Sequence, residues 1–93
     1  MIKSFGEKKT RRFVEEGVAE GFLKTIIKPA GRKITMLQMA ASLSDLAAFP
    51  GNRLEKLKGK RNGQYSVRIN DQFRICFRFE NGDAFDVEIT DYH

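Results

Sequence analysis

Apolar and polar residues alternate strictly through three consecutive segments of this chain, residues 64–70, 72–80 and 84–93. Their apolar positions are Tyr65, Val67 and Ile69, then Phe73, Ile75, Phe77 and Phe79, then Phe85, Val87 and Ile89. Successive side chains of a β-strand point to opposite faces of a sheet, so this period predicts antiparallel strands that bury one face. A further strand is predicted over residues 53–59.

The first half of the chain has a helical period instead. Residues 7–24 predict a helix that breaks near its end, because two glycines interrupt its apolar spacing. Residues 29–43 predict a second helix that packs on the sheet, in which Met36 and Met39 are expected to fill the core. Residues 44–52 predict a short helical turn that ends in a Pro-Gly turn.

These elements predict an α+β fold, with two N-terminal helices packed on an antiparallel sheet of four to five strands. The fifth is a short strand over residues 2–5, and we expect one domain over residues 1–93. No apolar run approaches the ~20 residues of a membrane span, and the N-terminus lacks a secretory apolar stretch, so a cytoplasmic protein is expected. One cysteine and one histidine cannot form a disulfide or a four-ligand zinc site, and neither a metal nor a cofactor is expected.

Charge is distributed unevenly along the chain. The formal net charge is +5, which favours an anionic partner. Residues 53–78 contain eight lysines and arginines and two acidic residues, whereas residues 79–93 contain five acidic residues and no lysine or arginine. This pattern indicates either a site for a polyanion or two strands that pair their charges.

The alternation also restricts the pairing register. Directly opposed residues lie on the same face, so the apolar faces coincide only if paired residue numbers add to an even total. For the last hairpin this excludes a two-residue loop and predicts a three-residue loop, Asn81-Gly82-Asp83. The expected polar-face pairs are Arg78 with Asp86, Cys76 with Glu88, and Arg74 with Thr90.

The same rule places Arg68 directly opposite Arg74 in the preceding hairpin. Opposed like charges destabilise a sheet unless an anion or an acid lies nearby, and the nearest acid in this register is Glu88, diagonal to Arg74. The alternative is that both arginines extend into water. Cys76 lies between Arg74 and Arg78, two cations that can lower the pKa of its thiol. We nevertheless expect a passive, reduced thiol.

The predicted last strand brings Asp91, Tyr92 and His93 to within one or two residues of Arg74. Tyr92 and His93 can transfer protons or stack on a base, while Arg74 and Lys58 can hold a phosphate. Cleavage of an RNA phosphodiester needs both kinds of group. These residues therefore suggest a phosphate site, and a solvated, uncommitted tail is the alternative.

Three stretches, "IKSF", "GNRLEKLKGKRNGQYSVRINDQFRICFRFENGD" and "DVEITDYH", resemble the HigB toxins, a branch of the RelE/ParE superfamily of bacterial toxin–antitoxin systems. The resemblance covers essentially the whole chain. It implies a RelE-like fold and a ribosome-dependent endoribonuclease that cuts mRNA in the ribosomal A site. The implied chemistry is metal-independent attack of the ribose 2′-hydroxyl on the adjacent phosphate. A HigA-like helix-turn-helix antitoxin is the implied partner, and through it operator DNA.

By this resemblance the functional residues are Lys58, Arg74, Asp91, Tyr92 and His93. The basic block adds candidate RNA-binding residues, namely Arg68, Lys56, Lys60 and Arg61. Some relatives carry a histidine where this chain has Glu55. Glu55 is therefore either a substitute base or only a partner of Arg53 or Lys56.

Two other functions fit the same sequence. The first is a non-catalytic module of the same fold that binds RNA or a protein, and the second is a ParE-like inhibitor of a topoisomerase. For the antitoxin we expect an apolar surface on the helical half, formed by Phe5, Phe13, Phe22 and Leu23.

Overall fold

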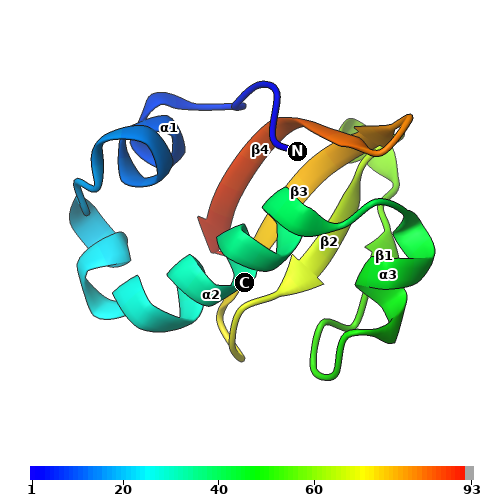
Figure 1. The fold of residues 1–93 in the computed structure, drawn as a ribbon. Helices are drawn as coiled ribbons and strands as arrows, with labels where there is room; N and C mark the ends of the chain where they lie inside the picture. The colour runs from blue at the N-terminus through cyan, green and yellow to red at the C-terminus, as the bar shows by residue number, and fades with distance from the viewer. Residues whose placement is uncertain (92–93) are drawn as a thin grey trace.

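The computed structural model describes residues 1–91. The helices are α1 (Lys8–Glu16), α2 (Ile27–Met39) and α3 (Leu43–Ala48), and 3₁₀ turns occupy η1 (Gly21–Thr25) and η2 (Gly59–Arg61). The strands β1 (Glu55–Lys56), β2 (Tyr65–Arg68), β3 (Phe73–Glu80) and β4 (Asp83–Asp91) form one antiparallel sheet in the order β1-β2-β3-β4. α2 crosses in front of the sheet and α1 lies beyond its β4 edge (Figure 1). The predicted α+β fold is confirmed.

The first residues of the chain run parallel to β4. The backbone N–H groups of Lys3 and Gly6 donate to the carbonyls of Ala84 and Val87 at 2.8 and 2.9 Å. The predicted strand over residues 2–5 is thus present as two isolated parallel bridges along the edge of the sheet.

Buried Thr10 fixes α1 to β4. Its hydroxyl accepts a hydrogen bond from the backbone N–H of Ile89 at 3.0 Å and donates to the Glu7 carboxylate. Glu7 is also the N-cap of α1, because it accepts from the Thr10 backbone N–H at 2.7 Å. The helix ends at Gly17, whose φ of 71° suits a glycine, so the predicted break is confirmed.

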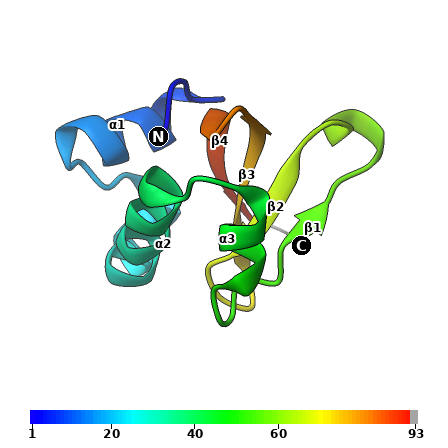
Figure 2. The same ribbon diagram turned by 45° about the vertical axis from the view of Figure 1, so that its right-hand side comes forward.

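The core lies between the helices and one face of the sheet (Figure 2). Its fully buried members include Leu23, Leu37, Leu46, Val67, Ile75, Phe77 and Val87. These come from both halves of the chain, as the two hydrophobic periods predict. Within residues 1–91, no helix is both long and apolar enough to cross a membrane.

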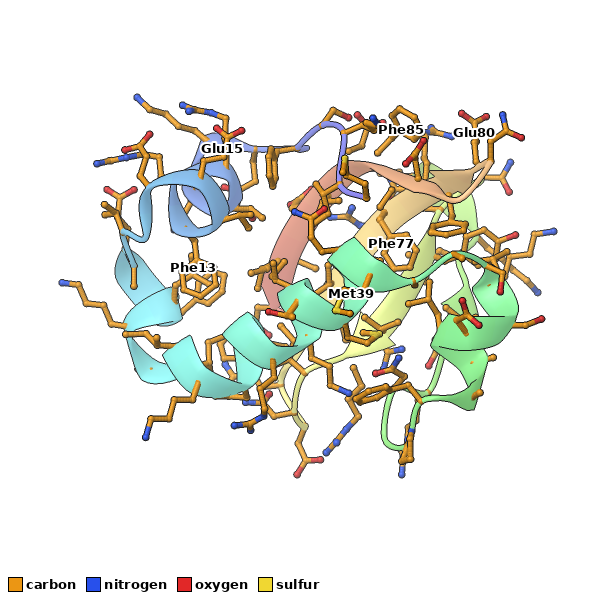
Figure 3. The ribbon with its side chains drawn as sticks, in the orientation of Figure 1. Phe13, Glu15, Met39, Phe77, Glu80 and Phe85 are labelled. Atoms are coloured by element: carbon orange, nitrogen blue, oxygen red, sulfur yellow. The ribbon has the colours of Figure 1, made fainter. Side chains whose placement is uncertain are left out.

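Two predictions about apolar side chains are wrong. Leu23 is buried in the core, and Phe5, Phe13 and Phe22 pack against it, so these residues do not form a free partner surface. Phe22 itself stacks on Phe73 with ring centroids 4.6 Å apart. Met39, expected in the core, is 79% exposed at the C-terminal end of α2 (Figure 3).

The last hairpin also differs from its prediction. Glu80 pairs with Asp83, so the loop consists of Asn81 and Gly82 alone. Their φ values of 50° and 82° are those of a tight two-residue turn. The two-residue loop that the parity rule excluded is therefore the one that forms.

A β-bulge reconciles this loop with the shared apolar face. β3 advances two residues between Cys76 and Arg78, while β4 advances three between Phe85 and Glu88. Asp86, at a φ of 53°, is the additional residue of β4, and it restores the even register further along the hairpin. Consequently Ala84 is buried in place of Phe85.

Asn52 connects α2, α3 and β2. Its buried side chain donates to the Leu46 carbonyl at 2.9 Å and accepts from Lys33 Nζ at 2.5 Å. Its own carbonyl accepts from the Arg68 N–H at 2.6 Å. Burial is the main cause that lowers the pKa of Lys33, and the nearby charges of Arg68 and Arg32 lower it further. Asn52 thus fixes the start of the segment that leads into β1.

Candidate active site

Arg74 is the central charged residue of the sheet face that points away from α2. Arg68 lies opposite it on β2 and Thr90 opposite it on β4, as predicted. The residue is only 6% exposed. A buried guanidinium requires hydrogen-bond acceptors, because an unpaired cation in the interior is costly.

Among residues 1–91, two neighbours supply acceptors and a third forms an ion pair with the guanidinium. Arg74 Nε donates to Ser66 Oγ at 2.8 Å, and its Nη2 donates to the Arg53 carbonyl at 2.6 Å. Glu55 Oε1 lies 3.7 Å from Nη2 and provides a carboxylate partner. Arg53 has a φ of 44°, which is uncommon for a residue with a side chain. The candidate site therefore has a guanidinium whose orientation is fixed by β1, β2 and the turn between Asn52 and β1.

The predicted clash between Arg68 and Arg74 is resolved inside the protein. Arg68 forms an ion pair with Asp71, and Arg74 pairs with Glu55. Each guanidinium thus has its own acid, so the register alone does not require a bound anion. Glu55 pairs with neither of the neighbours considered from sequence, and Glu88 is not the acid that contacts Arg74.

Glu88 instead forms an ion pair with Arg61, with Arg61 Nη2 3.4 Å from Glu88 Oε2. Arg61 also donates to Gln64 at 3.2 Å and is half-buried. These contacts hold η2 against β4. Arg61 is therefore a structural contact as well as a candidate RNA-binding residue.

The lysines of the basic block are exposed. Lys56 lies on β1, Lys58 directly precedes η2, and Lys60 lies within it. Among residues 1–91 none of the three forms an ion pair. They provide positive charge that solvent and a polyanion can reach, in the segment that directly follows Glu55.

The end of β4 is described as far as Asp91. Alternation along the strand puts Asp91 on the face of Ile89, opposite Phe73, and Thr90 on the face of Arg74. The Asp91 carboxylate accepts a hydrogen bond from Gln72 Nε2 at 3.1 Å. The predicted roles of Tyr92 and His93 concern residues that lie outside the described ones.

Cys76 is a free thiol on β3 that is fully buried, and its pKa differs from the lowered one considered from the sequence. Burial raises the pKa of its thiol, and Glu88 raises it further, while Arg61 and Arg74 act in the opposite direction. Loss of hydration thus outweighs the two cations. Cys76 is thus a buried free thiol, in agreement with the predicted passive role.

Sequence reasoning missed two contributors to this site, Ser66 and the Arg53 carbonyl. The parity rule does place Ser66 on the face of Arg68 and Arg74, so a small hydroxyl between apolar strand residues was a usable signal. A backbone carbonyl turned by an unusual φ leaves no such signal. Residues 1–91 contain no group of three or more His, Cys, Asp or Glu side chains that could hold a metal ion.

A family model described as a RelE-like toxin of the type II toxin–antitoxin system HigB matches residues 3–93. The chain belongs to this HigB-like toxin family. It is 33% identical to Endoribonuclease HigB of Proteus vulgaris, with all of both chains covered. It is also 35% identical to Toxin HigB-1 of Vibrio cholerae, with 90% of each chain covered.

Solved structures support the same fold for this HigB-like toxin. A YafQ mutant from E. coli superposes with a TM-score of 0.65 at 9% identity, covering 99% of this chain and 92% of that one. A YoeB–YefM complex from Staphylococcus aureus contains a chain that superposes with a TM-score of 0.61 at 19% identity, covering 100% and 95%. The predicted RelE-like fold is thereby confirmed.

Proposed function

We propose that this HigB-like toxin is an endoribonuclease that cuts mRNA in the ribosomal A site and so stops translation. The observation that carries the proposal is Arg74, a guanidinium held in one orientation by Ser66, Glu55 and the Arg53 carbonyl. A fixed cation stabilises a developing phosphate charge better than a mobile one, because it needs no reorganisation during the reaction. The similarity to an endoribonuclease of Proteus vulgaris agrees with this chemistry.

In the proposed reaction the ribose 2′-hydroxyl attacks the adjacent phosphorus. The P–O5′ bond breaks, leaving a 2′,3′-cyclic phosphate and a 5′-hydroxyl. Arg74 and Lys58 stabilise the charge on the phosphate oxygens, so the reaction requires no metal ion. Lys56, Lys60, Arg61 and Arg68 hold the flanking RNA backbone.

Two proton transfers accompany this step. One group removes the proton of the 2′-hydroxyl, and another protonates the leaving 5′-oxygen. We assign these transfers to Tyr92 and His93, with Glu55 as the alternative base. Glu55 suits that role because its carboxylate is half exposed while it lies 3.7 Å from Arg74. Asp91 is assigned a positioning role.

A type II toxin needs an antitoxin, and the family description places this chain in such a system. The superposed YoeB chain was likewise solved in complex with YefM. We propose a HigA-like helix-turn-helix antitoxin as the partner of this toxin. Through it the toxin reaches operator DNA, and both proteins act in the cytoplasm, where the ribosomes are.

Cleavage of mRNA on purified, programmed ribosomes tests the function. Wild-type protein is expected to cut in the A site, and Arg74→Ala is expected to slow cutting by roughly 100- to 1,000-fold, as for loss of one fixed oxyanion donor. Removal of Tyr92 and His93 is expected to abolish cutting. Arg78→Ala is the control, because Arg78 pairs with Asp86 at 3.2 Å outside the candidate site.

Three results separate the alternatives. If truncated protein cuts at the normal rate, the assignment of Tyr92 and His93 is wrong. If wild-type protein binds ribosomes without cutting mRNA, the chain is a non-catalytic binder of the same fold. If it instead inhibits a topoisomerase in a supercoiling assay, the ParE-like function is correct.

A further inference from the structure

An apolar groove of about 840 Å³ lies between α2 and α3, away from the candidate active site. Ile27, Met36, Met39 and Phe49 provide its large apolar side chains, and Lys28 and Arg32 also line it. Both helices contribute to its lining, and α3 lies nearer to β1 than α2 does (Figures 1 and 2). The groove thus differs in position and in chemistry from the face that carries Arg74.

Its apolar surface is unusually exposed. Met39 is 79% exposed, Ile27 51% and Phe49 47%. Within residues 1–91, these are three of the four large hydrophobic side chains that are exposed, the fourth being Met1. Monomeric proteins rarely gather such side chains in one place unless another molecule covers them.

The shape of α2 favours a helix as the covering element. The groove residues of α2 form two adjacent rows with a spacing of four, one containing Ile27, Gly31, Thr35 and Met39 and the other Lys28, Arg32, Met36 and Ala40. Rows with this spacing form ridges with a channel between them, and the ridge of a second helix fits such a channel. Gly31 has no atom within 4 Å of the place where a Cβ would lie, so the middle of the channel is open.

Charge specifies the partner further. Lys28 and Arg32 are exposed and form no ion pair with any residue from 1 to 91. The only acid in the lining, Asp45, accepts a hydrogen bond from the Ala41 N–H at 2.9 Å. Lys33 Nζ adds a further cation 5.2 Å from the centre of the Phe49 ring. A second copy of this chain would bring the same cations together, so the groove suits an acidic partner instead.

We propose that this groove binds an acidic amphipathic helix of the antitoxin. The helix places apolar side chains against Ile27, Met39 and Phe49, and its carboxylates lie next to Lys28 and Arg32. The inference rests on the proposed function only for the identity of the partner. This contact does not cover the sheet face that carries Arg74, so antitoxin and RNA occupy separate surfaces.

The test is the affinity of purified toxin variants for the antitoxin encoded beside the toxin gene, measured by isothermal titration calorimetry. Arg32→Glu reverses a groove charge, and Met39→Glu places a carboxylate in the apolar patch. Each is expected to weaken binding by about 30-fold or more, the effect of an interface hot spot. Lys24→Glu and Ala47→Glu are matched controls, since both residues are exposed outside the lining, and binding should change by less than about threefold.

Each remaining outcome overturns the inference. If all four variants bind with wild-type affinity, the antitoxin binds elsewhere, while its role as partner stands. If wild-type toxin does not bind the antitoxin at all, the partner proposal fails together with the groove. If the groove variants change only the binding of a labelled RNA oligonucleotide or self-association, the groove has a different occupant. All four substituted residues are on the surface, so each variant is expected to fold. Circular dichroism checks the fold of each one.

Discussion

Arg74 Nε and Ser66 Oγ form a 2.8 Å hydrogen bond between two buried side chains on neighbouring strands. The bond fixes the plane of the guanidinium, and the Arg53 carbonyl fixes its far end. Orientation of the most buried cation in the candidate site thus depends on a hydroxyl that has no chemical role of its own.

Ser66→Ala should therefore reduce mRNA cleavage without preventing ribosome binding. Loss of the hydroxyl removes the acceptor of Arg74 Nε, so the guanidinium is held less firmly. We expect the single-turnover rate of cleavage to decrease by about 10- to 100-fold. Ribosome binding is measured in parallel by co-sedimentation. Equal cleavage by wild-type protein and Ser66→Ala would show that the orientation of Arg74 does not depend on this bond.

Thr10→Val should destabilise the protein by roughly 1–3 kcal/mol, because the buried N–H of Ile89 loses its acceptor while the side chain keeps its shape. Urea unfolding followed by circular dichroism measures the change. Thr10→Ser retains the hydroxyl and is the control, with a smaller loss. A Val variant as stable as the Ser variant would contradict the role of this hydrogen bond.

The bulge gives a graded prediction at Asp86, where φ is 53°. Asp86→Val should cost roughly 1–2 kcal/mol, because a β-branched residue is strained in this conformation. Asp86→Asn tolerates the same φ and removes only the half-exposed ion pair with Arg78, so its cost should stay below about 1 kcal/mol. Thermal unfolding of the two variants should reveal this order, and the reverse order would place the strain elsewhere.

Cys76 should react slowly with a thiol reagent in the folded protein and quickly after unfolding. Its folded pKa is raised above the ordinary value of 9.0, so the unfolded thiol ionises first as the pH increases. The contribution of Cys76 to the free energy of unfolding is therefore complete below pH 9 and decreases as the pH rises through that value. Cys76→Ala should remove this decrease and leave toxicity unchanged. Rapid labelling of the native protein near pH 7.5 would contradict the burial effect.

Alternation allowed much of the sheet to be predicted. It identified the buried face, the pairs of Arg68 with Arg74 and of Arg74 with Thr90, and the packing of helices on one side. The bulge at Asp86 was not predictable in this way, because an aspartate at positive φ within a strand resembles any polar strand residue. The parity rule was correct, but it allows two loops. The apolar faces coincide with a three-residue loop, or with a two-residue loop if one strand contains an additional residue.

The candidate site was predictable only within the alternating strands. Glu55 escaped assignment as the partner of Arg74 because residues 53–59 lack a strict period, so no register could be derived for β1. Met39 was misplaced for a different reason. Helical spacing indicates which side chains share a face, but not where the helix ends or how far it extends past the sheet.

The hydrogen bonds from Lys3 and Gly6 to β4 have a consequence for the synthesis of this protein. Both residues have their partners more than 80 positions later in the chain. The N-terminal segment therefore cannot pair with β4 until β4 has left the exit tunnel. The hydrogen bond between Thr10 and Ile89 requires the same strand. The N-terminal segment therefore stays without its strand partner while the helices and the first three strands are synthesised.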